Sequence, residues 1–276
     1  MGSSRLAGLL IFIPVLAVAL VPALGRAQDL PLFDAHLHYN RSDWAVYSPE
    51  AALALLDQAG VRWAMLSSTP DEGTIRLYEK APDRIVPVLR PYRSPADQGT
   101  WTQDPSILPY VEQRLPRGIY RGIGEFHLSA DQTGSPVVRG FAALAARQGL
   151  FVYAHTDDVG VEALLRLEAG LQVLWAHAGM SAAPAVIGRL LDRHPRLLVE
   201  LSLRDPAAGG RLEPAWRDLF LRHPDRFLVG SDTWVTSRWG SLPAIHAENR
   251  RWLAQLPREI AEQIAYQNAQ RLTGRR

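Results

Sequence analysis

Cysteine is absent from this chain of 276 residues, and lysine occurs only once, as Lys80. Without cysteine, neither a disulfide nor a lipid anchor on a cysteine can form. The lack of disulfides is ordinary for a bacterial periplasmic enzyme with a large core and unusual for a small extracellular domain. Lys80 lies in a polar stretch far from any predicted strand end, so a Schiff-base mechanism is excluded.

The first 27 residues have the pattern of a secretory signal peptide. Arg5 is followed by the apolar stretch Leu6–Leu24 and by the small-residue ending Gly25-Arg26-Ala27, which predicts cleavage after Ala27. An apolar stretch of this length could instead remain as a membrane anchor, but Pro14 and Pro22 disfavour a spanning helix. We therefore predict secretion, to the bacterial periplasm, with no stable membrane association after cleavage.

Excess positive charge is also absent from the predicted mature chain, residues 28–276. The whole chain has 30 basic and 28 acidic residues, and Arg5 and Arg26 leave with the leader, so 28 of each remain. Binding of nucleic acid needs surplus Lys and Arg to neutralise phosphates, so no nucleic-acid partner is expected. Residues 28–276 contain no linker, low-complexity tract or charge run, which predicts a single domain.

Apolar segments of the kind that form strands alternate with helical patterns along this domain. Eight strands are predicted: Leu30–His38, Val61–Ser68, Ile85–Tyr92, Arg121–Leu128, Leu150–Thr156, Leu171–Gly179, Leu197–Leu203 and Phe227–Asp232. Between them lie segments with helical spacing such as Pro49–Ala59, Val137–Gln148, Val161–Ala169 and Ala183–His194. Eight strand–helix units predict an α/β fold, the (β/α)₈ TIM barrel. An open doubly wound sheet would be expected to have a glycine-rich phosphate loop after its first strand, where this chain has Asp34-Ala35-His36-Leu37-His38.

Ionisable residues gather at the predicted carboxyl ends of the strands, where catalytic groups of such barrels emerge. Because residues two apart on a strand share a face, we expect His36 and His38 to point into the barrel mouth with Asp34 beneath them. A His-x-His pair alone is equally consistent with two structural residues. The recurrence is more specific, since Glu125, His127, His155, His177 and Asp232 all end later strands. The remaining histidines, His194, His223 and His246, fall in helices or at helix ends and are interpreted as structural.

This set of residues resembles the metal-ligand signature of the amidohydrolase superfamily. The resemblance rests on Asp34 to His38, Glu125, His155, His177 and Gly230-Ser231-Asp232, and it spans nearly all of residues 28–276. The segment Ile264–Leu272 is similar to the closing helix of the amidohydrolase 2 group. The motifs occur in the strand order expected for that group.

The resemblance implies one or two divalent metal ions as cofactor. It implies that His36, His38, His155 and Asp232 share an ion, that Asp232 also serves as the base for a water molecule, and that His177 either binds a second ion or polarises the substrate. Zinc is the first expectation, with Mn, Fe and Ni as alternatives. Many members with two ions bridge them with a carboxylated lysine, which the position of Lys80 excludes. Glu125 is the expected substitute, either as the bridge or as an acceptor for a ligand's N–H.

The loops that follow the strands supply the candidates for substrate binding. These are His127, Trp44, Tyr47, Arg90, Arg204, Trp234 and Arg238. Arginines at this face suit a carboxylate, so a small anionic or aromatic acid derivative is expected as the substrate.

The function expected from these residues is hydrolysis of a small carbonyl substrate, a lactone, ester or amide, by water that the metal ion activates. The alternative within the superfamily is a metal-dependent decarboxylase that resembles aminocarboxymuconate-semialdehyde decarboxylase. The alternative outside enzymes is a periplasmic metal-dependent binding protein. The presence of both His177 and Asp232 favours an enzyme, because binding alone needs neither a base nor a group that polarises a carbonyl.

Overall fold

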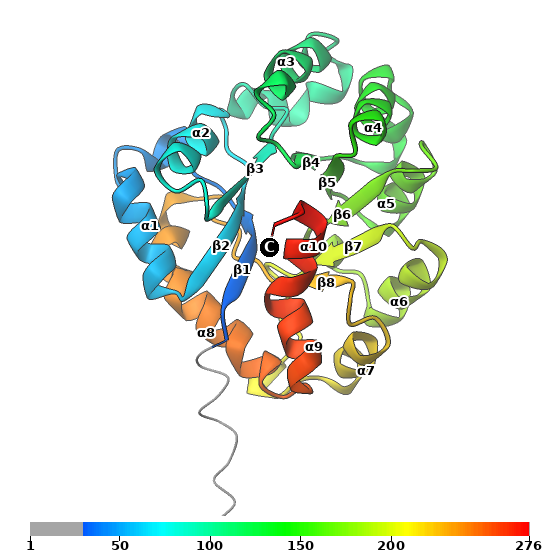
Figure 1. Cartoon of the computed structure of the whole chain (residues 1–276). Helices are drawn as coiled ribbons and strands as arrows, with labels where there is room; N and C mark the ends of the chain where they lie inside the picture. The colour runs from blue at the N-terminus through cyan, green and yellow to red at the C-terminus, as the bar shows by residue number, and fades with distance from the viewer. Residues whose placement is uncertain (1–29, 276) are drawn as a thin grey trace, which may run out of the picture.

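Eight parallel strands lie side by side in chain order in the computed structural model, which describes residues 30–275 (Figure 1). Between β1 and the chain after β8, the backbone N–H of Ala35 donates to the carbonyl oxygen of Val229 at 2.9 Å, which nearly closes the sheet into a barrel. The strands are β1 Leu32–Leu37, β2 Val61–Leu66, β3 Ile85–Leu89, β4 Gly122–His127, β5 Phe151–His155, β6 Gln172–Trp175, β7 Leu197–Glu200 and β8 Phe227–Leu228. The predicted TIM-barrel fold and its eight strands are confirmed. The predicted signal peptide lies outside the described residues.

Helices cover the outer face of the barrel (Figure 1). The helices around the ring are α1 Pro49–Gln58, α2 Glu72–Lys80, α3 Ile107–Arg114, α4 Pro136–Gln148, α5 Asp158–Leu165, α6 Pro184–Arg193, α7 Pro214–Arg222 and α8 Leu242–Leu253, and the C-terminal segment contains α9 Arg258–Glu262 and α10 Asn268–Thr273. Their ends follow local rules, as α4 illustrates. Ser135 accepts a hydrogen bond from the N–H of Val138, and Gly149 ends the helix in the left-handed conformation with φ 66°. None of the helices within residues 30–275 combines the length and apolar character needed to cross a bilayer.

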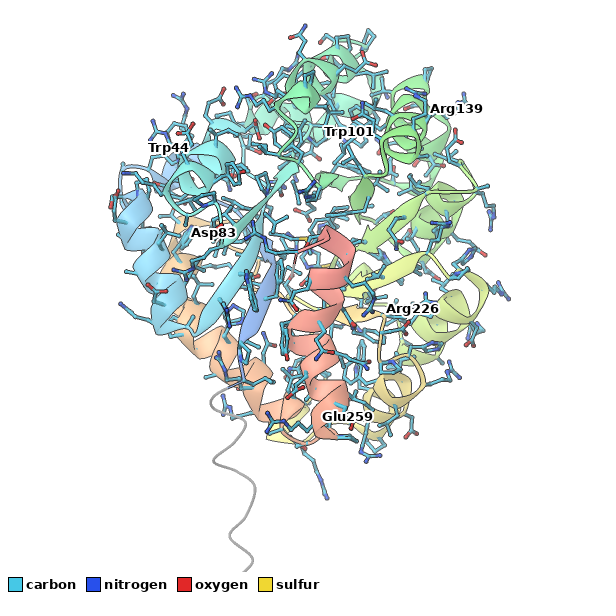
Figure 2. The ribbon with its side chains drawn as sticks, in the orientation of Figure 1. Trp44, Asp83, Trp101, Arg139, Arg226 and Glu259 are labelled. Atoms are coloured by element: carbon cyan, nitrogen blue, oxygen red, sulfur yellow. The ribbon has the colours of Figure 1, made fainter. Side chains whose placement is uncertain are left out.

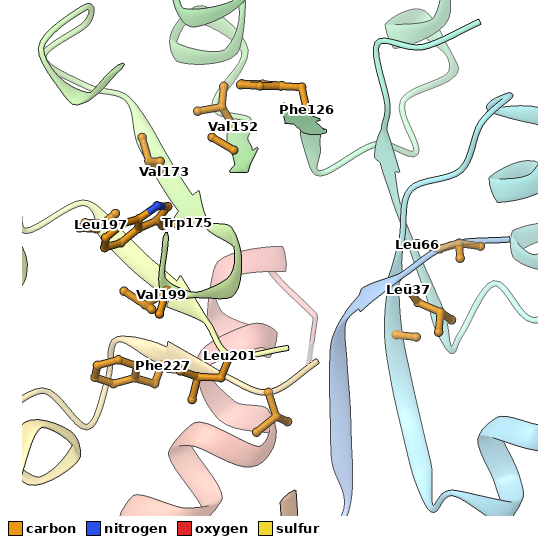
Figure 3. Packing of buried hydrophobic residues seen from close by; sticks show 14 of the residues in the cluster. Leu37, Leu66, Phe126, Val152, Val173, Trp175, Leu197, Val199, Leu201 and Phe227 are labelled. Atoms are coloured by element: carbon orange, nitrogen blue, oxygen red, sulfur yellow. The ribbon is translucent and has the colours of Figure 1, made fainter. Parts of the chain in front are cut away.

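The main core lies between the strands and the surrounding helices. Figure 3 shows part of it, with Trp175, Val199 and Phe227 among the fully buried members. The indole N–H of Trp175 donates to the carbonyl oxygen of Thr156 at 2.8 Å, so even the polar atom of this large side chain has a partner. A second cluster fills the inside of the barrel and includes Phe33 and Tyr153.

The C-terminal segment lies across the amino-terminal end of the barrel, in the centre of the ring in Figure 1. The side-chain amide of Asn268 donates to the carbonyl oxygens of Pro224 and Phe227 at 2.9 and 2.8 Å. Arg275 donates to the carbonyl oxygen of Asp83, which is labelled in Figure 2. These contacts cover the amino-terminal end, and the loops at the carboxyl end surround the candidate site.

Candidate metal centre

Two histidines at the end of β1 face each other across the barrel mouth. The Nε2 atoms of His36 and His38 lie 3.1 Å apart. The Nδ1–H of His36 donates to Glu200 Oε2 at 2.9 Å, and the Nδ1–H of His38 donates to the backbone carbonyl of Ser67. In the neutral rings the proton is therefore on Nδ1, and both Nε2 atoms present lone pairs to the same point.

Two carboxylates complete this group of acceptors. Glu125 Oε2 lies 3.3 Å from His36 Nε2 and 3.2 Å from His38 Nε2, and Asp232 Oδ1 lies 3.6 and 3.3 Å from the same nitrogens. A regular tetrahedron with metal–ligand bonds of about 2.0–2.1 Å has edges of about 3.3–3.4 Å, and the distances from each carboxylate oxygen to the two nitrogens are close to this. His36, His38 and Asp232 form one group whose ligand atoms are close enough to hold an ion, with Glu125 Oε2 beside it. Asp232 Oδ1 is buried and accepts no hydrogen bond. This donor set suits Zn²⁺ and similar ions.

The charges around this point also favour a cation. Burial raises the pKa values of Glu125 and Asp232, but the adjacent histidines, with His36 the largest contributor, together outweigh burial and hold both pKa values below their ordinary range. Burial lowers the pKa of His36, and the charges of Glu125, Asp232 and Glu200 reverse this and raise it well above its ordinary value. Three buried carboxylates face one guanidinium, that of Arg90. A divalent ion offsets the remaining negative charge.

The second oxygen of Glu125 faces a different pair of histidines. Glu125 Oε1 lies 3.0 Å from His155 Nδ1 and 3.5 Å from His177 Nε2. The Nδ1–H of His177 donates to the carbonyl oxygen of Ser202 at 3.0 Å, so its Nε2 lone pair points to the carboxylate. The family resemblance implies that His155 shares an ion with His36 and His38, whereas in the structure His155 lies in a group with Glu125 and His127. Glu125 thus stands between two groups of acceptors.

Arg90 holds Glu125 in this orientation. Its Nη2 donates to Glu125 Oε2 and its Nε to the backbone carbonyl of the same residue, both at 3.0 Å. Arg90 is 6% exposed, so this ion pair is shielded from water. Arg90, which the sequence predicts to bind substrate, therefore donates two of its N–H groups to Glu125, a candidate metal ligand. It also lines the cavity described below.

Glu200 is a member of the site that the sequence analysis missed. This fully buried carboxylate ends β7 and accepts hydrogen bonds from His36 Nδ1, from Tyr153 Oη at 3.0 Å and from Ser202 Oγ at 2.9 Å. It fixes the ring of His36 from behind. The signal that could have identified it was an ionisable residue in the middle of the otherwise largely apolar predicted strand Leu197–Leu203.

Asp34 does not lie beneath the two histidines, and that expectation is wrong. The register between β1 and β2 shifts between Asp34 and Leu37, so the simple alternation of faces fails there. The carboxylate of Asp34 accepts hydrogen bonds from Ser231 Oγ at 2.5 Å and from Nε2 of His246, in α8, at 3.0 Å. Asp34 therefore ties β1 to the chain after β8 and to the outer helix layer.

Strained backbone concentrates after the last three strands. Within residues 30–275, the five non-glycine residues with positive φ are His177, Ala178, Met180, Leu203 and Asp232. The left-handed conformation costs a residue with a side chain about 1–2 kcal/mol. Such strain persists only where surrounding contacts impose it, and it is found more often at functional sites than elsewhere.

A cavity of about 510 Å³ opens above the candidate metal centre. Its wall includes Glu125, His155 and Asp232, together with three of the predicted substrate-binding residues, His127, Arg90 and Trp234. Burial lowers the pKa of His127 to about 4, so its ring is neutral at physiological pH. The ring stacks on His155 with centroids 4.4 Å apart.

The other four substrate candidates do not line this cavity. Trp44 lies in a neighbouring groove under the guanidinium of Arg76, and Tyr47 packs on Trp239. The guanidinium groups of the other two candidates, both arginines, donate to backbone carbonyl oxygens. Arg204 donates to the carbonyl oxygens of Met180 and Ala182, and Arg238 donates to those of Ser231 and Asp232. The cavity wall also contains Asn40, Arg41, Ser42, Thr69, Met180 and Leu203, which the sequence analysis did not single out.

The amino-acid sequence matches a known protein family. A family model described as amidohydrolase matches residues 118–275, more than half of the chain. No curated protein matched the sequence.

Solved structures share the fold at low identity. A probable 2-pyrone-4,6-dicarboxylic acid hydrolase from Acinetobacter baumannii, crystallised with citric acid, is 16% identical, with a TM-score of 0.61 over 88% of this chain and 99% of that one. An amidohydrolase from Burkholderia multivorans with bound zinc is 17% identical, with a TM-score of 0.56 over 89% and 99%. A TatD homologue from Escherichia coli is 16% identical, with a TM-score of 0.62 over 88% and 98%. At these identities the likeness establishes the fold.

Proposed function

The chain belongs to the amidohydrolase family, and from that premise we propose that it is a metal-dependent hydrolase of small carbonyl compounds, with a lactone, ester or amide as the scissile group. The observation that carries the proposal is the convergence of four acceptor atoms, from His36, His38, Glu125 and Asp232, with no hydrogen-bond donor for Asp232 Oδ1. A divalent cation would satisfy His36, His38 and Asp232 Oδ1 together, with Glu125 Oε2 beside them.

Two positions for ions follow from the two oxygens of Glu125. The first comprises His36, His38, Asp232 and Glu125 Oε2, and the second comprises His155, His177 and Glu125 Oε1. Zinc is proposed at the first position, supported by its nitrogen and oxygen donors and by the zinc bound to the Burkholderia multivorans protein. The second position has fewer ligands within reach, and we expect it to bind its ion more weakly.

A bound divalent ion would supply Lewis acidity, which acidifies water and polarises a carbonyl oxygen. The residues of the chain would supply the proton transfer and the orientation. Asp232 stays ionised because its pKa lies below the ordinary range, so it can accept the proton that an attacking water molecule loses. His177 is held by Ser202 through Nδ1, which keeps its Nε2 directed at the centre.

The substrate is proposed to be a small molecule, supported by the cavity volume and by the citric acid found with the Acinetobacter baumannii protein. We also propose that the protein is secreted to the periplasm after cleavage of residues 1–27. Mass spectrometry of the native protein would then find a chain that begins at Gln28, whereas an intact chain bound to membranes would contradict cleavage.

The function is tested by turnover after metal reconstitution. Protein stripped with a chelator and reloaded with zinc or manganese is assayed against a panel of lactones, esters and amides, and against carboxylic acids for release of CO₂. We expect hydrolysis that depends on the added metal and disappears in Asp232→Asn. Release of CO₂ without hydrolysis would favour a decarboxylase, and metal binding without any turnover would contradict an enzymatic function.

A further inference from the structure

Exposed apolar side chains collect at the mouth of the cavity. Within residues 30–275, five large apolar side chains are exposed, and three of them line this cavity: Met180 at 47%, Leu203 at 45% and Trp234 at 57%. They follow β6, β7 and β8, which are successive strands of the barrel, so they lie along one side of the cavity mouth. We call these three residues the apolar arc. Apolar surface gathered in this way commonly marks a binding site.

The backbone that carries the apolar arc is held by specific contacts. Met180 and Leu203 both have φ 59°, a conformation that branched or bulky side chains seldom adopt. Arg204 donates to the carbonyl oxygens of Met180 and Ala182, which fixes the segment after β6. Arg238 fixes the segment just before Trp234 in the same way. The exposed side chains are thus presented on a strained and anchored backbone, where folding alone would favour glycine or a polar residue.

The same contacts remove the positive charge expected on this side of the mouth. Arg204 and Arg238 do not line the cavity, and Arg90 is paired with Glu125. Arg41, which follows β1, lines the cavity and makes no ion pair with the carboxylates of residues 30–275. Apart from Asp232 at the candidate metal centre, the wall over β6 to β8 therefore offers contact area to an uncharged group, and an anionic group has its partner, Arg41, on the β1 side.

We infer that the substrate carries an apolar group, an alkyl chain or an aromatic ring next to the scissile carbonyl, which packs against Met180, Leu203 and Trp234. This inference rests on the proposed hydrolase function and narrows its substrate class. The apolar arc and the candidate metal centre share one cavity, since Glu125, His155 and Asp232 line it too. A substrate that reaches the centre therefore touches the arc.

The experiment compares a homologous series on zinc-loaded protein. The substrates are γ-lactones with a 4-alkyl substituent from methyl to heptyl, and the probes for binding without turnover are sodium alkanoates from acetate to octanoate, measured by calorimetry. Each buried CH₂ is expected to raise kcat/KM, and the affinity for the alkanoate, about 2–4-fold until the arc is covered. The test variant combines Met180→Asn, Leu203→Asn and Trp234→Gln. Asparagine tolerates positive φ and is polar, so it keeps the backbone and removes the apolar surface.

The matched controls are Val46→Gln and Val159→Gln, which are 62% and 60% exposed and lie outside the cavity wall. The dependence on chain length should fall towards zero in the triple variant and persist in both controls. If no lactone is hydrolysed but the alkanoate series shows this pattern, the apolar site stands and the hydrolase function fails. If neither series depends on chain length in the wild type, the inference is overturned, even where lactones are hydrolysed. It is also overturned if the triple variant changes the oligomeric state, because the arc then covers a second copy.

Discussion

The Nε2 atoms of His36 and His38 lie 3.1 Å apart, and hydrogen bonds on the far side of each ring direct both lone pairs to the same point. Two neutral imidazoles in this arrangement repel each other unless a metal ion or a proton lies between them. The carboxylates of Glu125 and Asp232 approach the same point and strengthen that requirement. The pair therefore fits the bound ion that we propose.

Metal removal should lower thermal stability. A free-ion concentration of 100 times the Kd adds about 2.7 kcal/mol to the free energy of unfolding. For a domain of this size, that raises Tm by about 5–10 °C. Chelator-treated protein should melt lower by that amount and recover on addition of zinc, as measured by calorimetry. The double variant His36→Asn with His38→Asn should lose the recovery. His223→Asn, at the end of α7, is the control and should keep it. An equal gain from zinc in wild type and double variant would contradict the site.

Glu125→Gln should reduce the number of bound ions by about one per chain. Arg90 Nη2 donates to Oε2, and because a guanidinium cannot accept a hydrogen bond, the amide oxygen of the variant is held at that position. The NH₂ group then faces His155 and His177, where it cannot bind a cation. Metal analysis should show the second ion lost, with Glu112→Gln on the exposed surface of α3 unchanged. Identical metal content in wild type and Glu125→Gln would mean that Glu125 only orients a neighbouring ligand.

Asp232→Asn should separate catalysis from metal binding. An amide oxygen can still approach His36 and His38, so most of the first ion should remain. The variant has lost the group that accepts a proton, and loss of a general base typically lowers the rate about 10²–10⁴-fold. Steady-state kcat on the preferred lactone or ester, measured at equal metal content, checks this. Asp225→Asn is the control because this exposed aspartate precedes β8 at the other end of the barrel. A kcat within a few-fold of wild type would assign the base elsewhere.

The barrel could be predicted from the sequence because its signals are local. Each strand is a short apolar segment, and several helices, such as α4 at Gly149 and α6 at His194-Pro195, end at a glycine or a His-Pro step that can be recognised without knowing the partners. The position of the site could be predicted as well. Because the strands of a parallel barrel share a direction, the histidines and carboxylates at their carboxyl ends meet at one end of the barrel. All eight strands are present in the structure, and each is shorter than predicted.

The parts of the site that could not be predicted depend on contacts between distant segments. The side chain of Asp34 points away from the barrel interior because the register of β1 shifts against β2, and no local sequence pattern indicates that shift. Arg204 and Arg238 look like ligands for a carboxylate in the sequence, but their guanidinium groups bond to carbonyl oxygens that only the folded loops bring near. The two oxygens of Glu125 likewise face different pairs of histidines, and this arrangement depends on how four strands are placed in the fold.

Glu200→Gln tests whether the carboxylate behind His36 sets the affinity of the first ion. Oε1 of Glu200 accepts the N–H of Ser202, and its Oε2 accepts from His36 Nδ1, Tyr153 Oη and Ser202 Oγ, so both oxygens meet donors. A glutamine must turn its NH₂ towards one of these donors, which leaves a buried clash and removes the charge that favours the Nδ1–H form of His36. Loss of such a partner typically weakens metal binding about 10–100-fold.

Zinc affinity, measured by competition with a chromophoric chelator, is the appropriate measurement because it needs no substrate. Tyr153→Phe removes one donor and leaves the carboxylate charged, so its affinity should lie close to that of wild type. Glu213→Gln, on the exposed N-cap of α7, controls for the chemical change alone. If Glu200→Gln and Tyr153→Phe weaken zinc equally, the effect comes from general repacking of the barrel interior, and the charge of Glu200 has no special part in holding His36.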